Sequence, residues 1–94
     1  MTMTHAVVLI EAERDALPLL GETLAGTEGV AEAYSVTGEW DFVAIVRVPD
    51  HEQLAQVVTG QIGQLPGVVR TRTMVALAAF SKHDIERLFS IGGE

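Results

Sequence analysis

The chain has 94 residues, of which 48% are hydrophobic, and it carries a net charge of −7 and no cysteine. This length suits a single domain over residues 1–94, and the negative charge disfavours direct binding to nucleic acid. The lack of cysteine excludes disulfides, thiolate metal sites and cysteine nucleophiles. No basic signal-peptide start and no apolar run near the roughly 20 residues that cross a membrane are present, so we expect a cytoplasmic protein.

The first half of the chain predicts a strand, a helix and two further strands. Residues 5–12 form a continuous apolar run, which is typical of a strand covered on both faces. Residues 14–25 repeat leucine at helical spacing, and Asp15 is the expected N-cap of this helix. Residues 30–36 alternate as in a strand with unequal faces, and residues 42–48 form a second strand that is apolar on both faces.

The second half predicts a helix, a strand and a short terminal helix. Asp50 is the expected N-cap of a helix over residues 51–63, which carries one apolar stripe. Pro66-Gly67 predicts a turn. A long last strand follows over residues 68–80, and residues 82–89 have the pattern of a short helix.

The resulting order, βαββαβ, predicts an α+β fold of the ferredoxin-like type, a four-stranded antiparallel sheet with both helices on one face. Gly29-Val30 and Gly67-Val68 each follow a helix and open a strand, so the chain consists of two similar halves. The first and third strands are apolar on both sides, and no third layer is encoded to cover the second sheet face. We therefore expect a face-to-face dimer of the dimeric α/β barrel type.

The most informative segment is the corner between two predicted strands, Val36-Thr37-Gly38-Glu39-Trp40-Asp41-Phe42. Gly38 permits a sharp turn, and Trp40 offers a broad apolar wall with one N–H donor. Asp41 would pair with an ammonium group, and peptide N–H groups around Gly38-Glu39 would receive a carboxylate, so the corner suits an α-amino acid. The alternative is an ordinary hairpin turn, in which Asp41 caps its own backbone and Trp40 fills the dimer interface.

The remaining reactive side chains predict no catalytic, metal or cofactor site. The histidines lie on separate predicted elements without the spacing of metal ligands: His5, His51 and His83. Arg70 and Arg72 share one face of the last strand, where they would pair with Glu32 or an effector carboxylate, or remain as edge charges that discourage aggregation. No catalytic triad order, P-loop or dinucleotide fingerprint occurs, so we expect no enzyme.

The whole chain resembles the effector-binding domain of the Lrp/AsnC family of bacterial and archaeal regulators. The resemblance rests on the element order, on the Gly-x-aromatic-Asp pattern within residues 36–42, and on Leu65-Pro66-Gly67-Val68-Val69-Arg70-Thr71-Arg72-Thr73. It implies dimers that assemble into octamers or related rings, with amino-acid effectors bound between dimers. The pocket residues that the resemblance implies are Gly38, Glu39, Trp40 and Asp41, with Thr71 and Thr73 as polar contacts from the last strand.

Family members usually carry an N-terminal helix-turn-helix domain, whereas here the first strand begins by residue 5. The resemblance therefore predicts a stand-alone effector module, which would modulate a full-length Lrp/AsnC regulator by mixed assembly and would not bind DNA directly. Two other functions stay open: a small cofactor-free enzyme on a similar dimer, and a structural assembly partner without a ligand. The inward-facing side chains are Val, Ile, Ala and Leu, which disfavours the enzyme.

Overall fold

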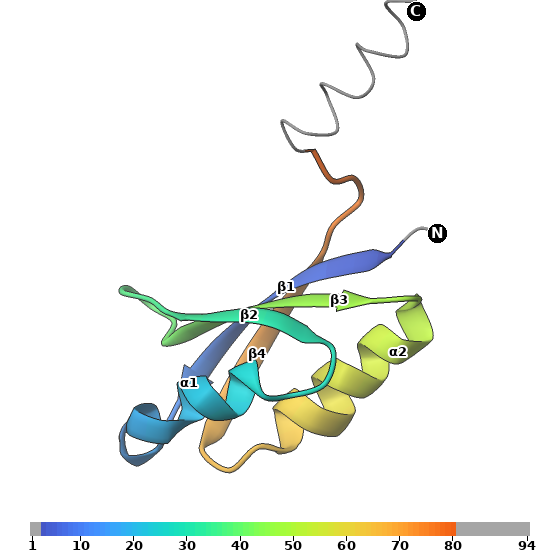
Figure 1. Ribbon diagram of the computed structural model, residues 1–94. Helices are drawn as coiled ribbons and strands as arrows, with labels where there is room; N and C mark the ends of the chain where they lie inside the picture. The colour runs from blue at the N-terminus through green and yellow to red at the C-terminus, as the bar shows by residue number, and fades with distance from the viewer. Residues whose placement is uncertain (1–2, 81–94) are drawn as a thin grey trace, which may run out of the picture.

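The computed structural model describes residues 3–80, so the helix predicted over residues 82–89 lies outside the described range. The elements are β1 (Thr4–Ala12), η1 (Arg14–Ala16), α1 (Leu17–Ala25), β2 (Val30–Ser35), β3 (Phe42–Val48), α2 (His51–Ala55), η2 (Gln56–Gln61), η3 (Ile62–Gln64) and β4 (Val68–Val75). The strands form one antiparallel sheet in the order β2-β3-β1-β4, which confirms the predicted ferredoxin-like fold (Figure 1). Within residues 3–80 no helix is long and apolar enough to cross a membrane.

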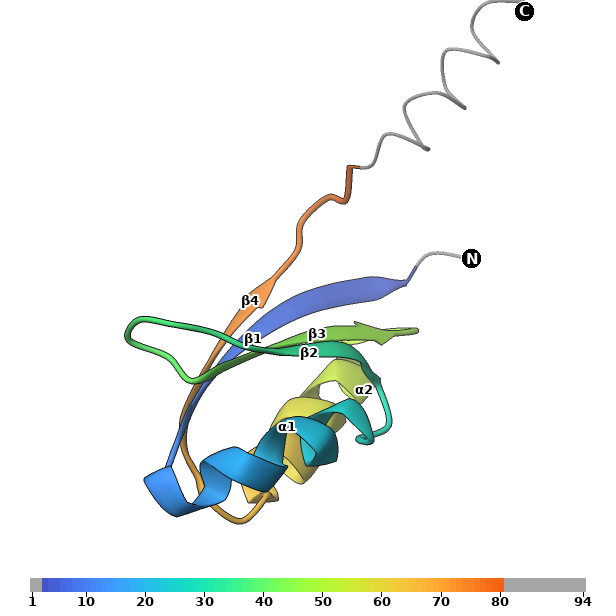
Figure 2. The ribbon, with the colours of Figure 1, turned by 60° about the vertical axis from the view of Figure 1, so that its left-hand side comes forward.

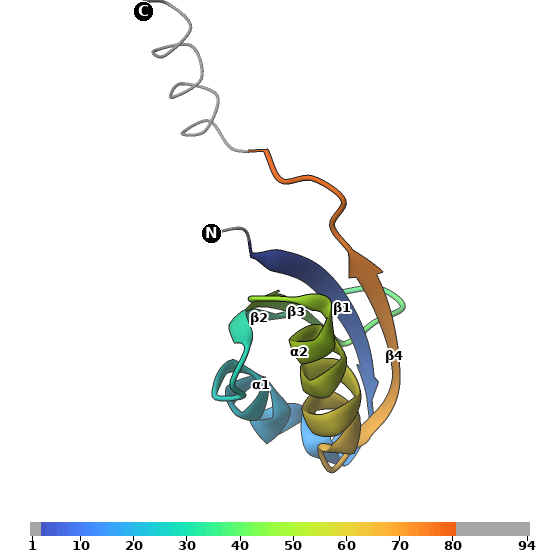
Figure 3. The same cartoon turned by 90° about the vertical axis from the view of Figure 1, so that its right-hand side faces the viewer.

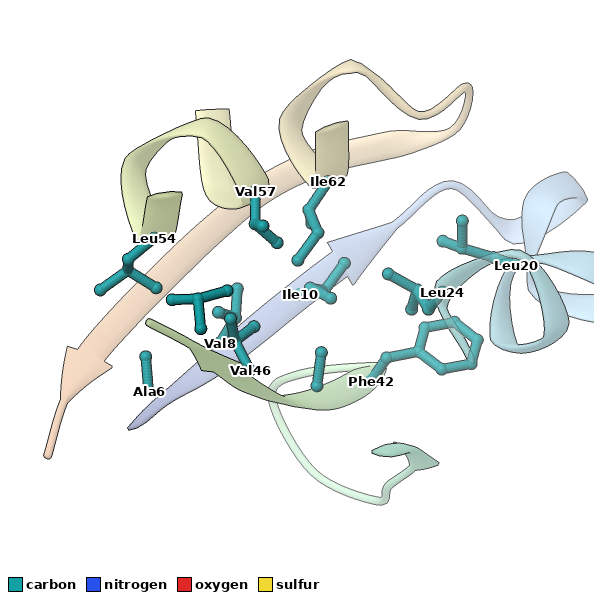
Figure 4. Close-up of a cluster of buried hydrophobic side chains, with 12 residues drawn as sticks. Ala6, Val8, Ile10, Leu20, Leu24, Phe42, Val46, Leu54, Val57 and Ile62 are labelled. Carbon is teal, nitrogen blue, oxygen red and sulfur yellow. The ribbon is translucent and has the colours of Figure 1, made fainter. Parts of the chain in front are cut away.

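Both helices cover the same face of the sheet, and the sheet curves around them (Figures 2 and 3). Alternate side chains of the central strands β1 and β3 point into this layer and meet the apolar sides of the helices (Figure 4). The buried core consists of Ala6, Val8, Ile10, Leu20, Leu24, Phe42, Ala44, Val46, Val48, Leu54, Val57 and Ile62. No polar or charged side chain within residues 3–80 is buried.

The other face of the sheet carries no helix of the described chain, and we call it the open face. Successive strand residues point to opposite faces, so the registers place the alternate residues of each strand here. Its central side chains are apolar and only partly buried: Val7, Leu9, Val43 and Ile45. Met74 is a further apolar side chain on this face. Polar and charged side chains surround the apolar centre: His5, Glu11, Glu32, Tyr34, Arg47, Arg70 and Arg72.

The second helical segment is less regular than the predicted single helix. Asp50 caps it as predicted, because its carboxylate accepts a hydrogen bond from the Gln53 N–H at 2.9 Å. After α2, the segment η2 is π-helical, and the N–H of Ile62 donates to the carbonyl of Val57 at its end. The wider turn lets Val57 and Ile62, five positions apart, both face the core, where they are 5% and 0% exposed.

Two predicted element ends differ from the structure. The first helix begins with the short turn η1, and Asp15 is not its N-cap, since no side chain caps η1 or α1. The last strand ends at Val75, short of its predicted end. β4 pairs with β1, and the last bond between them runs from the Ala76 N–H to the His5 carbonyl at 2.9 Å. This bond lies next to the start of β1 at Thr4.

The similarity of the two halves is visible in the turns that open β2 and β4. Gly29 and Gly67 both have a φ of +92°, a conformation that favours glycine. A Cβ atom on Gly67 would lie 2.2 Å from the Cβ of Ala16, and one on Gly29 would lie 2.5 Å from a methyl group of Val57. Each glycine therefore lets a strand start close against a helix.

Candidate functional site

The corner loop, residues 36–41, connects β2 to β3 and projects beyond the sheet (Figure 2). A hydrogen bond from the Val36 N–H to the Asp41 carbonyl closes its base at 3.0 Å. Gly38 has a φ of +106°, and a Cβ atom placed on it would meet nothing within 4 Å. The glycine is therefore favoured by backbone conformation and not by crowding, and the space beside the tip of the loop is open.

Asp41 anchors the corner loop to β1. Its N–H donates to the Ile10 carbonyl at 2.9 Å, and its Oδ2 accepts from the Ala12 N–H at 2.8 Å, where the register of β1 against β4 shifts. The side chain thus caps backbone, as in the hairpin alternative, although the capped residue belongs to β1 and not to the loop itself. The other carboxylate oxygen, Oδ1, accepts no hydrogen bond from residues 3–80.

Trp40 lies beside the start of β4. The guanidinium carbon of Arg70 is 4.4 Å from the centre of its ring and that of Arg72 is 5.9 Å away, both within the range of cation–π attraction. Arg70 Nε also donates a hydrogen bond to Glu11 Oε1 at 3.0 Å, and its Nη2 forms ion pairs with the same oxygen at 2.9 Å and with Glu39 Oε1 at 3.9 Å. The corner loop is therefore held to the edge strand by a stacked and ion-paired arginine.

Neither arginine pairs with Glu32 within the subunit, contrary to one of the predicted pairings. Glu32 lies on the opposite edge strand, where its Oε1 is 3.4 Å from Arg47 Nη2 and its Oε2 accepts a hydrogen bond from the Tyr34 hydroxyl. This hydrogen bond, and then the negative charge of Glu32, raise the pKa of Tyr34 above its usual value. The open face thus carries a cluster of charged side chains at each edge.

Thr71 and Thr73 do not point to the same side of the sheet as Trp40. They pair with Ile10 and Val8 of β1, whose side chains lie in the covered core, so the threonines face the helices. Their neighbours Arg70 and Arg72 face the opposite way and reach the ring. The sequence placed these arginines on one strand face and left open that they pair with an effector carboxylate, but the resemblance did not include them among the pocket residues.

Two hollows of the described chain lie away from the corner loop. They have volumes of about 390 and 460 Å³ and lie beside α1 and α2, and neither is lined by Trp40 or Asp41. The described chain also holds no group of three metal-ligating side chains. Because the space beside Gly38 is open, a ligand enclosed at the corner loop would need a second surface against it.

Comparison with known sequences identifies the family. Residues 5–85 match the profile of the Lrp/AsnC ligand binding domain. The HTH-type transcriptional regulator PF0250 of Pyrococcus furiosus, itself uncharacterized, is 32% identical over 82 residues, which cover 84% of this chain and 55% of that protein. The chain spans about half the length of the curated relatives it matches.

Two solved structures are similar to this chain over most of its length. TTHA0845 from Thermus thermophilus is 46% identical with a TM-score of 0.78, and the match covers 84% of this chain and 99% of that one. The feast or famine regulatory protein Rv3291c from M. tuberculosis, complexed with L-methionine, is 30% identical with a TM-score of 0.65, covering 84% of this chain and 53% of that one. The chain belongs to the Lrp/AsnC family, as its ligand binding domain.

Proposed function

We propose that this domain binds a free amino acid at the corner loop, in a site that a second subunit completes, and so modulates a transcription regulator. The observation that carries this proposal is the gathering of both charge signs beside one aromatic wall. The guanidinium groups of Arg70 and Arg72 lie near Trp40, whose loop also bears the carboxylates of Glu39 and Asp41. A zwitterion needs partners of both signs.

The backbone of the corner loop supports the same ligand class. Among residues 3–80, the N–H groups of Gly38, Glu39 and Trp40 donate no hydrogen bond, and Asp41 Oδ1 accepts none. Free N–H groups in a bent loop suit a carboxylate, and a free carboxylate oxygen suits an ammonium group. The complex of the relative Rv3291c with L-methionine supports an amino acid as the ligand.

Thr71 and Thr73 are less favourably placed to contact the proposed ligand than the arginines beside them. Their side chains lie on the covered side of the edge strand β4, where both are half-buried. They would reach a ligand at Trp40 only around that edge.

We propose that a face-to-face dimer forms through the open face and that a neighbouring dimer supplies the second surface of the site. The apolar side chains of Val7, Leu9, Val43 and Ile45 are left without cover by the described chain, and a second sheet would bury them. Because Trp40 contacts the arginines at the margin of this face, the corner loop lies at the edge of the proposed dimer, where a subunit of a second dimer can approach it. Assembly into an octamer or related ring, and mixed assembly with a full-length Lrp/AsnC regulator, belong to the same proposal.

Catalysis is not part of the proposed function. The relatives are named transcriptional regulators, which supports a regulatory role and a cytoplasmic location. The core of residues 3–80 buries no polar or charged side chain, which disfavours a catalytic site within it. The net charge of −7 argues that any DNA contact is made by another domain or protein.

Thermal denaturation against a panel of free L-amino acids, with calorimetric titration of each hit, tests the proposal. A ligand at about 100 times its Kd is expected to stabilise the domain by about 2.7 kcal/mol. The D-enantiomer of each hit serves as a control for nonspecific stabilisation. If no amino acid raises the melting temperature while sedimentation shows an intact oligomer, the domain is a structural assembly partner without a ligand.

A further inference from the structure

The two arginines beside Trp40 differ in how their charge is compensated. Arg70 has two carboxylates within 4.0 Å, those of Glu11 and Glu39, and its guanidinium stacks on the ring. Arg72 has no carboxylate within 4.0 Å among residues 3–80, and it lies farther from the ring centre. Arg70 is therefore engaged in holding the corner loop, whereas the donors of Arg72 remain available.

Arg72 lies on the open face, so its uncompensated charge would be covered when a second subunit binds there. It pairs with Leu9 across the sheet, and Leu9 in turn pairs with Val43, so its neighbours in this row of the open face are apolar. A cation that is taken out of water among apolar groups is costly unless an anion accompanies it. Once a second subunit covers the open face, as the proposed function requires, Arg72 needs an anionic partner.

We infer that Arg72 binds the carboxylate of the effector and thereby restricts the site to small molecules with a free carboxylate. The inference rests on the proposed function, and it names the residue that selects the ligand class. The planar guanidinium can donate two parallel hydrogen bonds to one carboxylate, and the carboxylate keeps further lone pairs for the N–H groups of Gly38 and Glu39. Asp41 Oδ1 is then left for the ammonium group.

The test compares an amino acid with its carboxamide, which lacks the negative charge. The probes are L-methionine and L-methioninamide or, if the panel ranks another amino acid first, that amino acid and its amide, each titrated calorimetrically. The wild-type domain is expected to bind the acid at least about tenfold more tightly. Arg72→Gln is expected to weaken binding of the acid by about 10- to 100-fold and to leave the amide unchanged, so that the preference disappears.

Two arginine variants serve as matched controls. Arg70→Gln removes the same charge from the same strand face, and because it loosens Trp40 we expect it to weaken acid and amide alike and to preserve their ratio. Arg47→Gln removes a positive charge at the opposite end of the open face, where Arg47 pairs with His5, and we expect both affinities to stay as in the wild type.

Arg72→Lys keeps the charge of the side chain without the planar guanidinium. It is expected to retain only part of the preference for the acid, and it replaces Arg72→Gln if that variant does not fold.

The outcomes separate this inference from the proposed function. An acid-to-amide ratio that stays at the wild-type value in Arg72→Gln overturns the inference alone. A lower assembly state of Arg72→Gln without ligand also overturns it, because Arg72 would then pair with a neighbouring subunit. A wild-type domain that binds no amino acid overturns the proposed function, and the inference with it.

Discussion

The two faces of the sheet are built from alternate residues of the same strands, yet the chain completes only one of them. On the covered face, the fully buried residues of β1 and β3 are Val8, Ile10, Ala44 and Val46. On the open face, their partly exposed counterparts are Val7, Leu9, Val43 and Ile45. The residue types are alike, so the difference comes from the placement of the helices. The covered face holds the subunit together, and the open face is available to a second molecule.

The strongest test of the covered face is Ile10→Ala. Ile10 is 0% exposed within the core, so the substitution leaves a cavity and is expected to lower the free energy of unfolding by about 2–5 kcal/mol. Urea denaturation at two protein concentrations measures this loss, which should appear at both. Val69→Ala, at a position that is 56% exposed, should change stability by no more than about 0.5 kcal/mol. Similar losses in both variants would contradict the assigned core.

The open face is tested by Ile45→Glu. A carboxylate at the centre of this face would be buried without a partner in the proposed dimer, at a cost of roughly 3 kcal/mol or more. We expect a folded monomer by circular dichroism and a loss of the oligomer in sedimentation. Leu19→Glu places the same charge on α1, where Leu19 is 71% exposed, and should leave assembly unchanged. An intact oligomer of Ile45→Glu would argue against association through this face.

Asp41 joins the corner loop to the sheet, so its substitution affects both the stability of the domain and the candidate site. Asp41→Ala leaves the Ala12 N–H without its acceptor, so the ligand-free domain should lose about 1–3 kcal/mol of stability. Asp41→Asn keeps an acceptor oxygen at this position and should lose less. If the carboxylate also binds an ammonium group, both variants should lose the stabilisation by amino acids while assembly persists. Amino-acid binding retained by Asp41→Asn would limit Asp41 to the structural role.

A smaller effect is expected from the contact between Trp40 and Arg70. Such pairs at exposed sites contribute about 0.5–1 kcal/mol, so Arg70→Gln should lower stability only slightly. Trp40 is the single tryptophan of the chain, and its fluorescence reports its own surroundings. We expect the emission of Arg70→Gln to shift to longer wavelength as the ring becomes more exposed to water. An unchanged spectrum would mean that Arg70 does not hold the ring.

The smallest effect concerns Tyr34 at the other edge of the open face. Its hydroxyl donates to Glu32, and this hydrogen bond raises the pKa of Tyr34 above its usual value. A group whose pKa is raised by folding contributes stability below its unfolded pKa, and this contribution is lost as the pH rises through the folded value. Glu32→Gln should therefore lower the midpoint of tyrosinate formation, measured by ultraviolet absorbance of this single tyrosine. An unchanged midpoint would show that the hydrogen bond is not formed in solution.

Most of the fold could be predicted from the sequence, because hydrophobic periodicity is a local signal. The doubly apolar runs marked β1 and β3 as the central strands, and the leucine spacing marked α1. Asp50 is an effective cap because its acceptor lies three residues from the N–H that it binds. The sequence did not predict the π-helical turn, because this turn depends on Val57 and Ile62 both packing into the core of the folded chain.

The candidate site could be predicted only in part. The corner was recognised from its residue types, but the partners of its side chains are set by the register between distant segments. Arg70 meets Glu11, 59 positions away, because β1 and β4 pair in one register, and the alternation of β4 then turns Arg72 toward Trp40 and the threonines away. Local residue patterns therefore specify the elements and their order. Which charges meet at the corner loop depends on the folded chain, because pairing between strands joins segments that are far apart in the sequence.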